Sequence, residues 1–242
     1  MTMSPNCSRI GAGAWAGYTP CIMLPTDPPF TLQPLGDAAA RVWLGPAIDP
    51  QTRSRLRAFT AWLAQADVPG ITEWVPAYET VAVFYRPEQT TYAALCAALQ
   101  GWTPGDSAPN DMPGPIITLP VRYGGADGPD LDAVARLHHC TPADVVARHA
   151  APIYDVVMLG FLPGFPYLSG LPETLHTPRL AVPRALVPAG SVGIGGAQTG
   201  VYPCASPGGW RLIGRTDMSL FDVQADPPAL LRPGDRVRFV PL

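Results

Sequence analysis

Residues 184–216 read RALVPAGSVGIGGAQTGVYPCASPGGWRLIGRT, a run in which short apolar stretches alternate with glycine and proline. From Ile153 onward the sequence keeps this texture, which is typical of short strands joined by tight turns. Two helical patterns precede it, near residues 129–138 and 142–149, and the second opens on Thr141 as an N-cap followed directly by proline. The second half of the chain is therefore predicted to be a β-barrel with two early helices.

The N-terminal half has a different pattern. Apolar residues recur in four short runs, and two further segments have helical character, the first of them starting at Pro50 with Asp49 as its N-cap. Strands are predicted over 30–35, 40–44, 71–76 and 80–85, and helices from Pro50 past Leu63 and over 87–99. This β-β-α-β-β-α order predicts a small α/β sandwich with its helices on one face of the sheet.

Residues 103–115 read TPGDSAPNDMPGP, and this proline- and glycine-rich run separates the two halves. We therefore predict an α+β chain in which an N-terminal α/β sandwich domain spans 29–103, a linker spans 104–115 and a β-barrel domain spans 116–242. Residues 1–28 show no periodicity, so we expect them to form a poorly ordered extension.

Composition excludes several classes of function. Hydrophobic residues make up 47% of the 242 residues and charged residues 14%, which is enough apolar material for a buried core. The net charge of -3 gives no basic field for nucleic acid or anionic lipid, and no apolar run has the length of a membrane span. Five widely spaced cysteines without a C-x-x-C pair predict neither a disulfide framework nor a zinc site. We expect a cytoplasmic protein without a signal peptide.

The basic residues are sixteen arginines, and the sequence contains no lysine. A Schiff base to pyridoxal phosphate needs a lysine, and so do a P-loop and a covalently attached biotin. A nucleotide or a biotin used in the reaction would therefore bind by other means or on a partner chain.

Polar side chains interrupt the glycine-rich run in a way that a simple loop does not require. The arginines, including Arg179, could bind a carboxylate or phosphate through paired hydrogen bonds, or could form surface ion pairs. Glycine N–H groups in this run could form an anion-binding nest, although glycines also serve tight barrel corners. The predicted binding residues are Arg184, Ser191, Gln198, Thr199, Ser206 and Arg215, with Tyr167 and Trp210 as walls of an apolar pocket or as parts of the core.

The sequence identifies no catalytic nucleophile and no metal ligands. The segment around Ser191 does not have the G-x-S-x-G pattern of a nucleophile elbow. His138 and His139 are adjacent and would point about 100° apart on a helix, which makes a poor metal-binding pair. His149 ends a predicted helix, where its positive form would suit the helix dipole. Catalytic residues stay unassigned, and no metal site is predicted.

Several long motifs, in the same order along the chain, resemble one family. They are LGDAAARVWLG at 35–45, VPGITEWVPAYETVAVFY at 68–85, GFLPGFPYLSGL at 160–171, VPAGSVGIGGAQTGVYP at 187–203, SPGGWRLIGRT at 206–216 and LLRPGDRVRF at 230–239. Together they resemble the family that includes the 5-oxoprolinase B subunit, the kinase inhibitor KipI and allophanate hydrolase subunit 1. The resemblance implies that the barrel is cyclophilin-like.

The resemblance also implies partners and a cofactor. Members of this family pair with a related second polypeptide, here the 5-oxoprolinase C subunit or a KipA-like chain, and one further 5-oxoprolinase polypeptide completes the enzyme. ATP with magnesium is implied as well, and it could be bound together with the partner subunits. The implied substrate is a small amide.

Three functions remain open at this point. The first is ATP-dependent opening of 5-oxoproline to glutamate, in which phosphorylation of the lactam oxygen would make the carbonyl carbon open to attack by water. The second is a carboxyltransferase or allophanate-hydrolase-type subunit that acts on urea-like amides. The third is a KipI-like inhibitor of a sensor histidine kinase. Because all three share the motifs of the fold, the sequence alone does not separate them.

Overall fold

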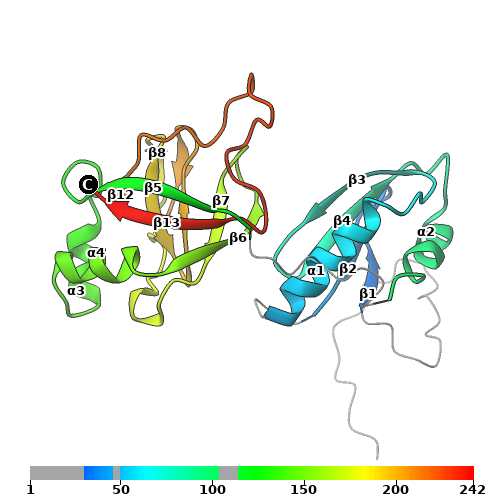
Figure 1. Cartoon of the computed structure of the whole chain (residues 1–242), viewed down its shortest axis with the longest axis horizontal. Coiled ribbons are helices and arrows are strands. Elements are labelled where there is room, and N and C mark those ends of the chain that lie inside the picture. Colours follow the sequence, from blue (N-terminus) through cyan, green and yellow to red (C-terminus); the bar gives the residue numbers. More distant parts are fainter. Residues whose placement is uncertain (1–29, 46–49, 104–113) are drawn as a thin grey trace, which may run out of the picture.

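The computed structural model describes residues 30–45, 50–103 and 114–242. Their elements form two units that lie side by side, a sheet covered by two helices and a closed barrel with two helices of its own (Figure 1). The predicted α+β class, a small sandwich followed by a β-barrel, is confirmed. The predicted extension over 1–28 and most of the predicted linker, residues 104–113, lie outside the described residues.

The first unit is an antiparallel sheet of four strands in the order β1-β2-β4-β3. Its elements are β1 (Thr31–Pro34), β2 (Ala39–Trp43), α1 (Pro50–Leu63), β3 (Ile71–Pro76), β4 (Thr80–Tyr85) and α2 (Tyr92–Leu99). The largest difference from the predicted boundaries is at α2, which begins at Tyr92 and not at residue 87, whereas the ends of β1 and β2 differ by one residue. The side chain of Thr91 accepts a hydrogen bond from the Ala94 N–H and so caps the helix at that point.

Both helices cover the same face of this sheet. Leu56, Phe59 and Leu63 form the apolar stripe of α1 and are buried in one core with alternate residues of β2 and β4. Trp102 completes the core with its ring edge-on to Phe59 at 5.1 Å between ring centroids. The apolar stripe of α1 therefore packs against those residues of β2 and β4 that alternate toward the core, and this contact forms the predicted sandwich.

The second unit is a closed barrel with the strand order β10-β7-β6-β13-β5-β12-β9. Its strands are β5 (Ile116–Tyr123), β6 (Ile153–Leu159), β7 (Pro166–Ser169), β9 (Ser191–Gly195), β10 (Gln198–Val201), β12 (Arg211–Arg215) and β13 (Arg236–Pro241). A short 3-10 helix, η1 (Glu173–Leu175), follows β7, and β8 (Arg184–Val187) pairs with β11 (Ser206–Gly208) in a separate two-stranded sheet. β5 and β13 pair in parallel, and the other neighbours of the barrel are antiparallel.

Two helices, α3 (Leu131–Leu137) and α4 (Pro142–Ala150), pack on the barrel on the side away from the first unit (Figure 1). Thr141 is the N-cap of α4, as predicted, and together with Asp144 it forms a capping box there. At its other end, α4 carries a fully buried His149 into the barrel core.

His149 is neutral and fixed by hydrogen bonds. The Thr199 hydroxyl donates to the Gly193 carbonyl oxygen at 2.9 Å, so the Nε2–H of His149 donates to the Thr199 oxygen, also at 2.9 Å. Nδ1 then accepts from the Tyr123 hydroxyl at 2.8 Å. Burial lowers the pKa of His149 to about 3, which removes the charged form that its place near the helix end had suggested.

The two units have separate apolar cores, so we propose that each is a domain and that the boundary lies in the segment between them. Limited proteolysis should cut within residues 104–113 and release a stable fragment of residues 116–242, which mass spectrometry would identify. Cleavage confined to residues 160–216 would contradict this boundary.

The buried imidazole of His149 should make the fold sensitive to acid. In the unfolded chain this group takes up a proton below its ordinary pKa of 6.5, whereas in the folded chain it stays neutral down to about 3. Stability is therefore lost as the pH falls from 6.5 toward 3. Between about pH 7 and pH 5 we expect this group to lower the free energy of unfolding by about 2 kcal/mol. Chemical denaturation of the wild type and His149→Gln at both pH values tests this; equal losses in the two proteins would refute it.

Candidate functional site

On the outer face of the barrel, the Trp210 ring lies directly against two glycines, Gly195 and Gly200. A Cβ added to Gly195 would come within 2.5 Å of the Trp210 ring, and one added to Gly200 would lie 3.0 Å from it. Neither glycine has a positive φ, so both serve the close approach of the indole. Gly190 and Gly196, by contrast, have φ of 78° and 67°, and they make the tight corners that the sequence suggested.

Other aromatic rings surround this indole. Phe165 and Tyr167 meet it edge-on, with ring centroids 5.5 and 5.9 Å away, and Tyr202 stacks edge-on against Phe165 at 5.2 Å. The exposed Arg179 guanidinium lies 5.8 Å from the Trp210 ring centroid. We call these five residues the aromatic surface. Burial raises the pKa of the Tyr167 and Tyr202 hydroxyls, so both keep their protons.

Phe161 extends the aromatic surface from a strained position. Its φ is 69°, and the Leu162 N–H donates to the Gly160 carbonyl oxygen at 2.8 Å, which closes a three-residue γ-turn. Its ring is 60% exposed and touches Phe165 only edge-on. A bulky residue in such a backbone costs about 1–3 kcal/mol, and strain of this kind clusters at functional sites.

The first unit contributes a tyrosine to the same place. Tyr78 sits in the turn between β3 and β4, and its hydroxyl oxygen accepts a hydrogen bond from the Gln198 amide on β10. Its ring lies edge-on to Tyr167 at 5.9 Å. Burial raises the pKa of Tyr78 to about 12, although the Gln198 hydrogen bond acts in the opposite direction. Tyr78 is therefore a neutral phenol at the junction of the two units.

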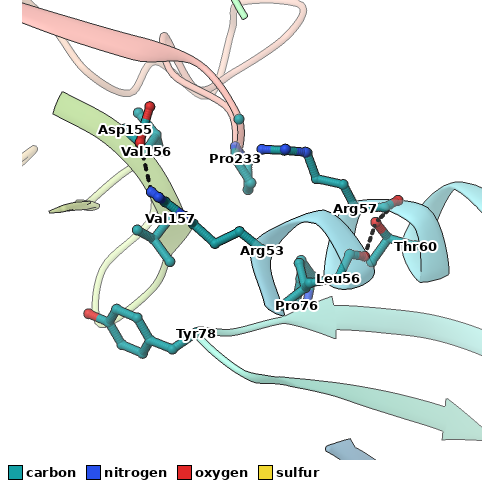
Figure 2. Close-up of a pocket in the computed structure, with 11 residues that line it drawn as sticks. Arg53, Leu56, Arg57, Thr60, Pro76, Tyr78, Asp155, Val156, Val157 and Pro233 are labelled. Carbon is teal, nitrogen blue, oxygen red and sulfur yellow. Dashed lines mark hydrogen bonds and ion pairs between the residues drawn. The ribbon is translucent and has the colours of Figure 1, made fainter. Parts of the chain in front are cut away.

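A cleft of about 100 Å³ separates α1 from β6 beside Tyr78 (Figure 2). Arg53 crosses it, and its Nη1 lies 2.7 Å from Oδ2 of Asp155 and 3.2 Å from the Ser169 hydroxyl. Because Asp155 is about half exposed, this ion pair adds little stability by itself. It joins the two units across the cleft. The cleft is lined by Arg53, Leu56, Arg57, Thr60, Pro76, Tyr78, Asp155, Val156, Val157, Pro233 and Gly234.

The predicted arginines are engaged with the protein itself. Arg184 pairs with Asp130 at 2.8 Å, and the second oxygen of that carboxylate accepts from the Leu212 N–H at 2.7 Å. Arg215 donates to the Ala189 carbonyl oxygen at 2.9 Å. Asp130 thus ties the start of α3 to β12 and β8, and both guanidiniums have structural partners.

The remaining predicted residues separate according to the face of their strand. Gln198 faces outward and joins Tyr167 and Trp210 on the aromatic surface, whereas its neighbour Thr199 points into the barrel core. Ser191 is buried opposite Arg215 in the β9–β12 ladder, and Ser206 is buried in β11.

Sequence reasoning missed Tyr78, Arg53 and Asp155. One signal was available for Tyr78: it occupies a short hairpin turn, where glycine, asparagine, aspartate and proline are the usual residues. Arg53 and Asp155 gave no signal, since their pairing joins segments that are 102 positions apart.

Comparison with known proteins decides the family. Residues 30–231 match the family model described as carboxyltransferase domain, subdomain C and D. The chain is 48% identical over 212 residues to the 5-oxoprolinase B subunit of Escherichia coli O157:H7, which covers 86% of this chain and 94% of the relative. It is 44% identical over 217 residues to the Haemophilus influenzae protein of the same name, and this match covers 87% of this chain and 97% of that relative. The chain belongs to the 5-oxoprolinase B-subunit family. The resemblance seen in the sequence motifs is thereby confirmed.

Solved structures of related proteins share the fold. TTHA0988 is 36% identical with a TM-score of 0.74, and the match covers 84% of this chain but 40% of that one, so the chain spans about two fifths of TTHA0988. PH0987 from Pyrococcus horikoshii is 38% identical with a TM-score of 0.53, and the match covers 88% of this chain and 97% of that one. Urea amidolyase from K. lactis, at 22% identity, has a TM-score of 0.72 over 90% of this chain and 15% of that one, and it supports the fold alone.

The described residues contain neither a candidate metal site nor a helix suited to crossing a membrane. Within residues 30–45, 50–103 and 114–242, no group of three or more His, Cys, Asp or Glu side chains could hold a metal ion. In the same residues, none of the helices combines the length and apolarity that crossing a membrane requires.

The role of Gly195 can be tested by adding a side chain at this position. Gly195→Ala should push the Trp210 ring away and destabilise the fold by about 1–3 kcal/mol, as overpacking typically does. Gly209→Ala is the matched control, because its added Cβ would meet nothing closer than 3.6 Å. Thermal melts and Trp fluorescence of both variants check this; equal stability of the two variants would contradict the role assigned to Gly195.

Proposed function

We propose that this chain is a subunit of a 5-oxoprolinase complex, which opens 5-oxoproline to glutamate, and that its aromatic surface binds the substrate. The observation that carries this proposal is the meeting of a guanidinium, an amide and flat apolar walls on one outer face of the barrel. The names of the relatives support the reaction, and the surface supports the kind of molecule that is bound.

The substrate carries three groups that match this surface. Its carboxylate suits Arg179, whose guanidinium is exposed and can form paired hydrogen bonds. Its lactam suits Gln198, which can both donate and accept. Its flat five-membered ring suits the faces and edges of Tyr167 and Trp210. The neutral tyrosine hydroxyls add hydrogen-bond donors without adding a negative charge that would repel the carboxylate.

The described residues do not fit ATP and magnesium. The Trp210 ring fills the glycine run that the sequence offered as an anion-binding nest for phosphates. Magnesium favours carboxylate oxygens, and the described residues hold no group of acidic side chains that could bind a metal. We therefore propose that ATP binds on partner subunits and assign no step of nucleotide chemistry to this chain.

Partner chains also follow from what the candidate site lacks. No histidine or carboxylate forms part of the aromatic surface in the described residues, and His149 is neutral inside the barrel. A general base that activates the attacking water would have to come from elsewhere. We propose that a paired chain, either the 5-oxoprolinase C subunit or a KipA-like protein, supplies it together with one further 5-oxoprolinase polypeptide, and that the complex works in the cytoplasm.

The substrate site can be tested in the assembled complex. Arg179→Ala and Gln198→Ala should each lower kcat/KM for 5-oxoproline by more than about tenfold, since each removes a hydrogen bond to a polar substrate group. The KM for ATP should stay unchanged. Steady-state kinetics with thermal melts as a folding check give the answer.

Arg238→Ala is the control, because Arg238 is exposed on β13 and outside the aromatic surface. The chain without partners should give no turnover. Near-normal kinetics in both site variants would rule out the proposed substrate site, and full turnover by the chain alone would rule out the need for partners.

A further inference from the structure

The candidate site contains a pair of hydrogen-bonding groups that comes from both units. Gln198 belongs to β10 of the barrel, and Tyr78 belongs to the β3–β4 turn of the first unit. Each side chain is half-buried, so a ligand can reach it. Within the described residues, neither side chain makes a hydrogen bond other than the one that joins them.

This pair leaves an acceptor and donors free for a ligand. One amide N–H of Gln198 donates to the Tyr78 oxygen, which leaves the Gln198 carbonyl oxygen as an acceptor, and the second amide N–H and the Tyr78 hydroxyl proton as donors. Rotation of the amide by half a turn gives the same result. In that case the phenol donates to the carbonyl oxygen, and the amide N–H and the phenol oxygen become the free donor and acceptor.

A neighbouring donor and acceptor match one edge of a lactam. The ring of a lactam forces its amide to be cis, so that its N–H and its C=O lie on the same side. An open-chain secondary amide is trans and turns these groups to opposite sides, because the cis form costs about 2.5–4 kcal/mol. The phenol also keeps its proton at neutral pH, so it is available there as a donor.

We propose that Tyr78 is a specificity-determining residue which, with Gln198, recognises the cis-amide edge of a five-membered lactam. This inference rests on the proposed function and deepens it. Arg179 lies close enough to act electrostatically on both Tyr78 and Tyr167, so it can take the carboxylate of the same molecule. The opened product has no cis-amide edge, so it no longer presents an adjacent amide N–H and C=O to the pair.

The arrangement also makes the site depend on both units. Tyr78 reaches Gln198 only while the first unit lies against the barrel, where Arg53 bridges to Asp155 and Ser169. The recognition pair is therefore assembled by the contact between units and is not present in the barrel alone.

A double-mutant cycle in the assembled complex tests the pair. Tyr78→Phe keeps the ring and removes the hydroxyl, and we expect it to raise the KM for 5-oxoproline by about five- to tenfold with a smaller change in kcat. Gln198→Ala should do the same or more. The double variant should be within about twofold of Gln198→Ala alone, because both changes disrupt one shared unit.

Analogues test the edge itself. In the wild type, N-methyl-5-oxoproline lacks the lactam N–H and should compete with 5-oxoproline about tenfold less well than 2-oxo-imidazolidine-4-carboxylate, a cyclic urea that keeps the edge. In the Tyr78→Phe/Gln198→Ala double variant this discrimination should shrink. Tyr85→Phe is the matched control for Tyr78→Phe, since it also removes a hydrogen-bonded hydroxyl from the first unit, there to the Asp37 carbonyl oxygen, away from the barrel.

The outcomes separate this inference from the proposed function. If Gln198→Ala and Arg179→Ala impair the enzyme while Tyr78→Phe behaves like Tyr85→Phe, the substrate site stands and the role of Tyr78 is refuted. If the Tyr78→Phe/Gln198→Ala double variant weakens 5-oxoproline and its N-methyl analogue equally, the pair does not read the edge, and the inference again falls. If none of the three site variants changes the kinetics, the substrate site and this inference are both wrong.

Discussion

The approach of the Trp210 indole to β9 and β10 is the contact on which the outer face of the barrel depends. It is possible only where the strands present no side chains, and Gly195 and Gly200 provide that space. Once the indole lies there, it offers edges to Phe165 and Tyr167 and a face to Arg179. A segment that looks like a flexible glycine loop is therefore a rigid floor, and its rigidity is what can hold a small ligand in one orientation.

Strand β10 links this floor to the interior of the barrel. Gln198 and Thr199 are neighbours, yet one reaches Tyr78 on the first unit and the other reaches His149 in the core. The inner network is neutral and fully hydrogen-bonded, so it fixes the height and tilt of the strand without adding charge. The hydrogen bonds of Thr199 inside the barrel thus fix the position of the neighbouring Gln198 amide on the outer face.

Much of the fold was predictable because its signals are local. The strands predicted over 71–76 and 80–85 match the structure to the residue, since alternation and turn residues mark their ends. The predicted start of α2 was wrong because a proline such as Pro87 is common at the first position of a helix. In the structure the chain makes a turn there, and Thr91 caps the helix. The candidate site was harder, because whether a strand residue faces inward or outward depends on register. Gln198 and Thr199 differ by one position, and Tyr78 joins from 120 positions away.

The parallel pairing of β5 with β13 has a consequence for how the protein is made. These are the first and last strands of the barrel, and they lie beside each other along six residue pairs (Figure 1). On the ribosome, the sandwich can form as soon as Trp102 has emerged, since its core lies within residues 30–102. The barrel must wait for its final strand, and until then the inner faces of β5 and β6 are open to water. Loss of β13 would leave a finished sandwich attached to an open, aggregation-prone sheet.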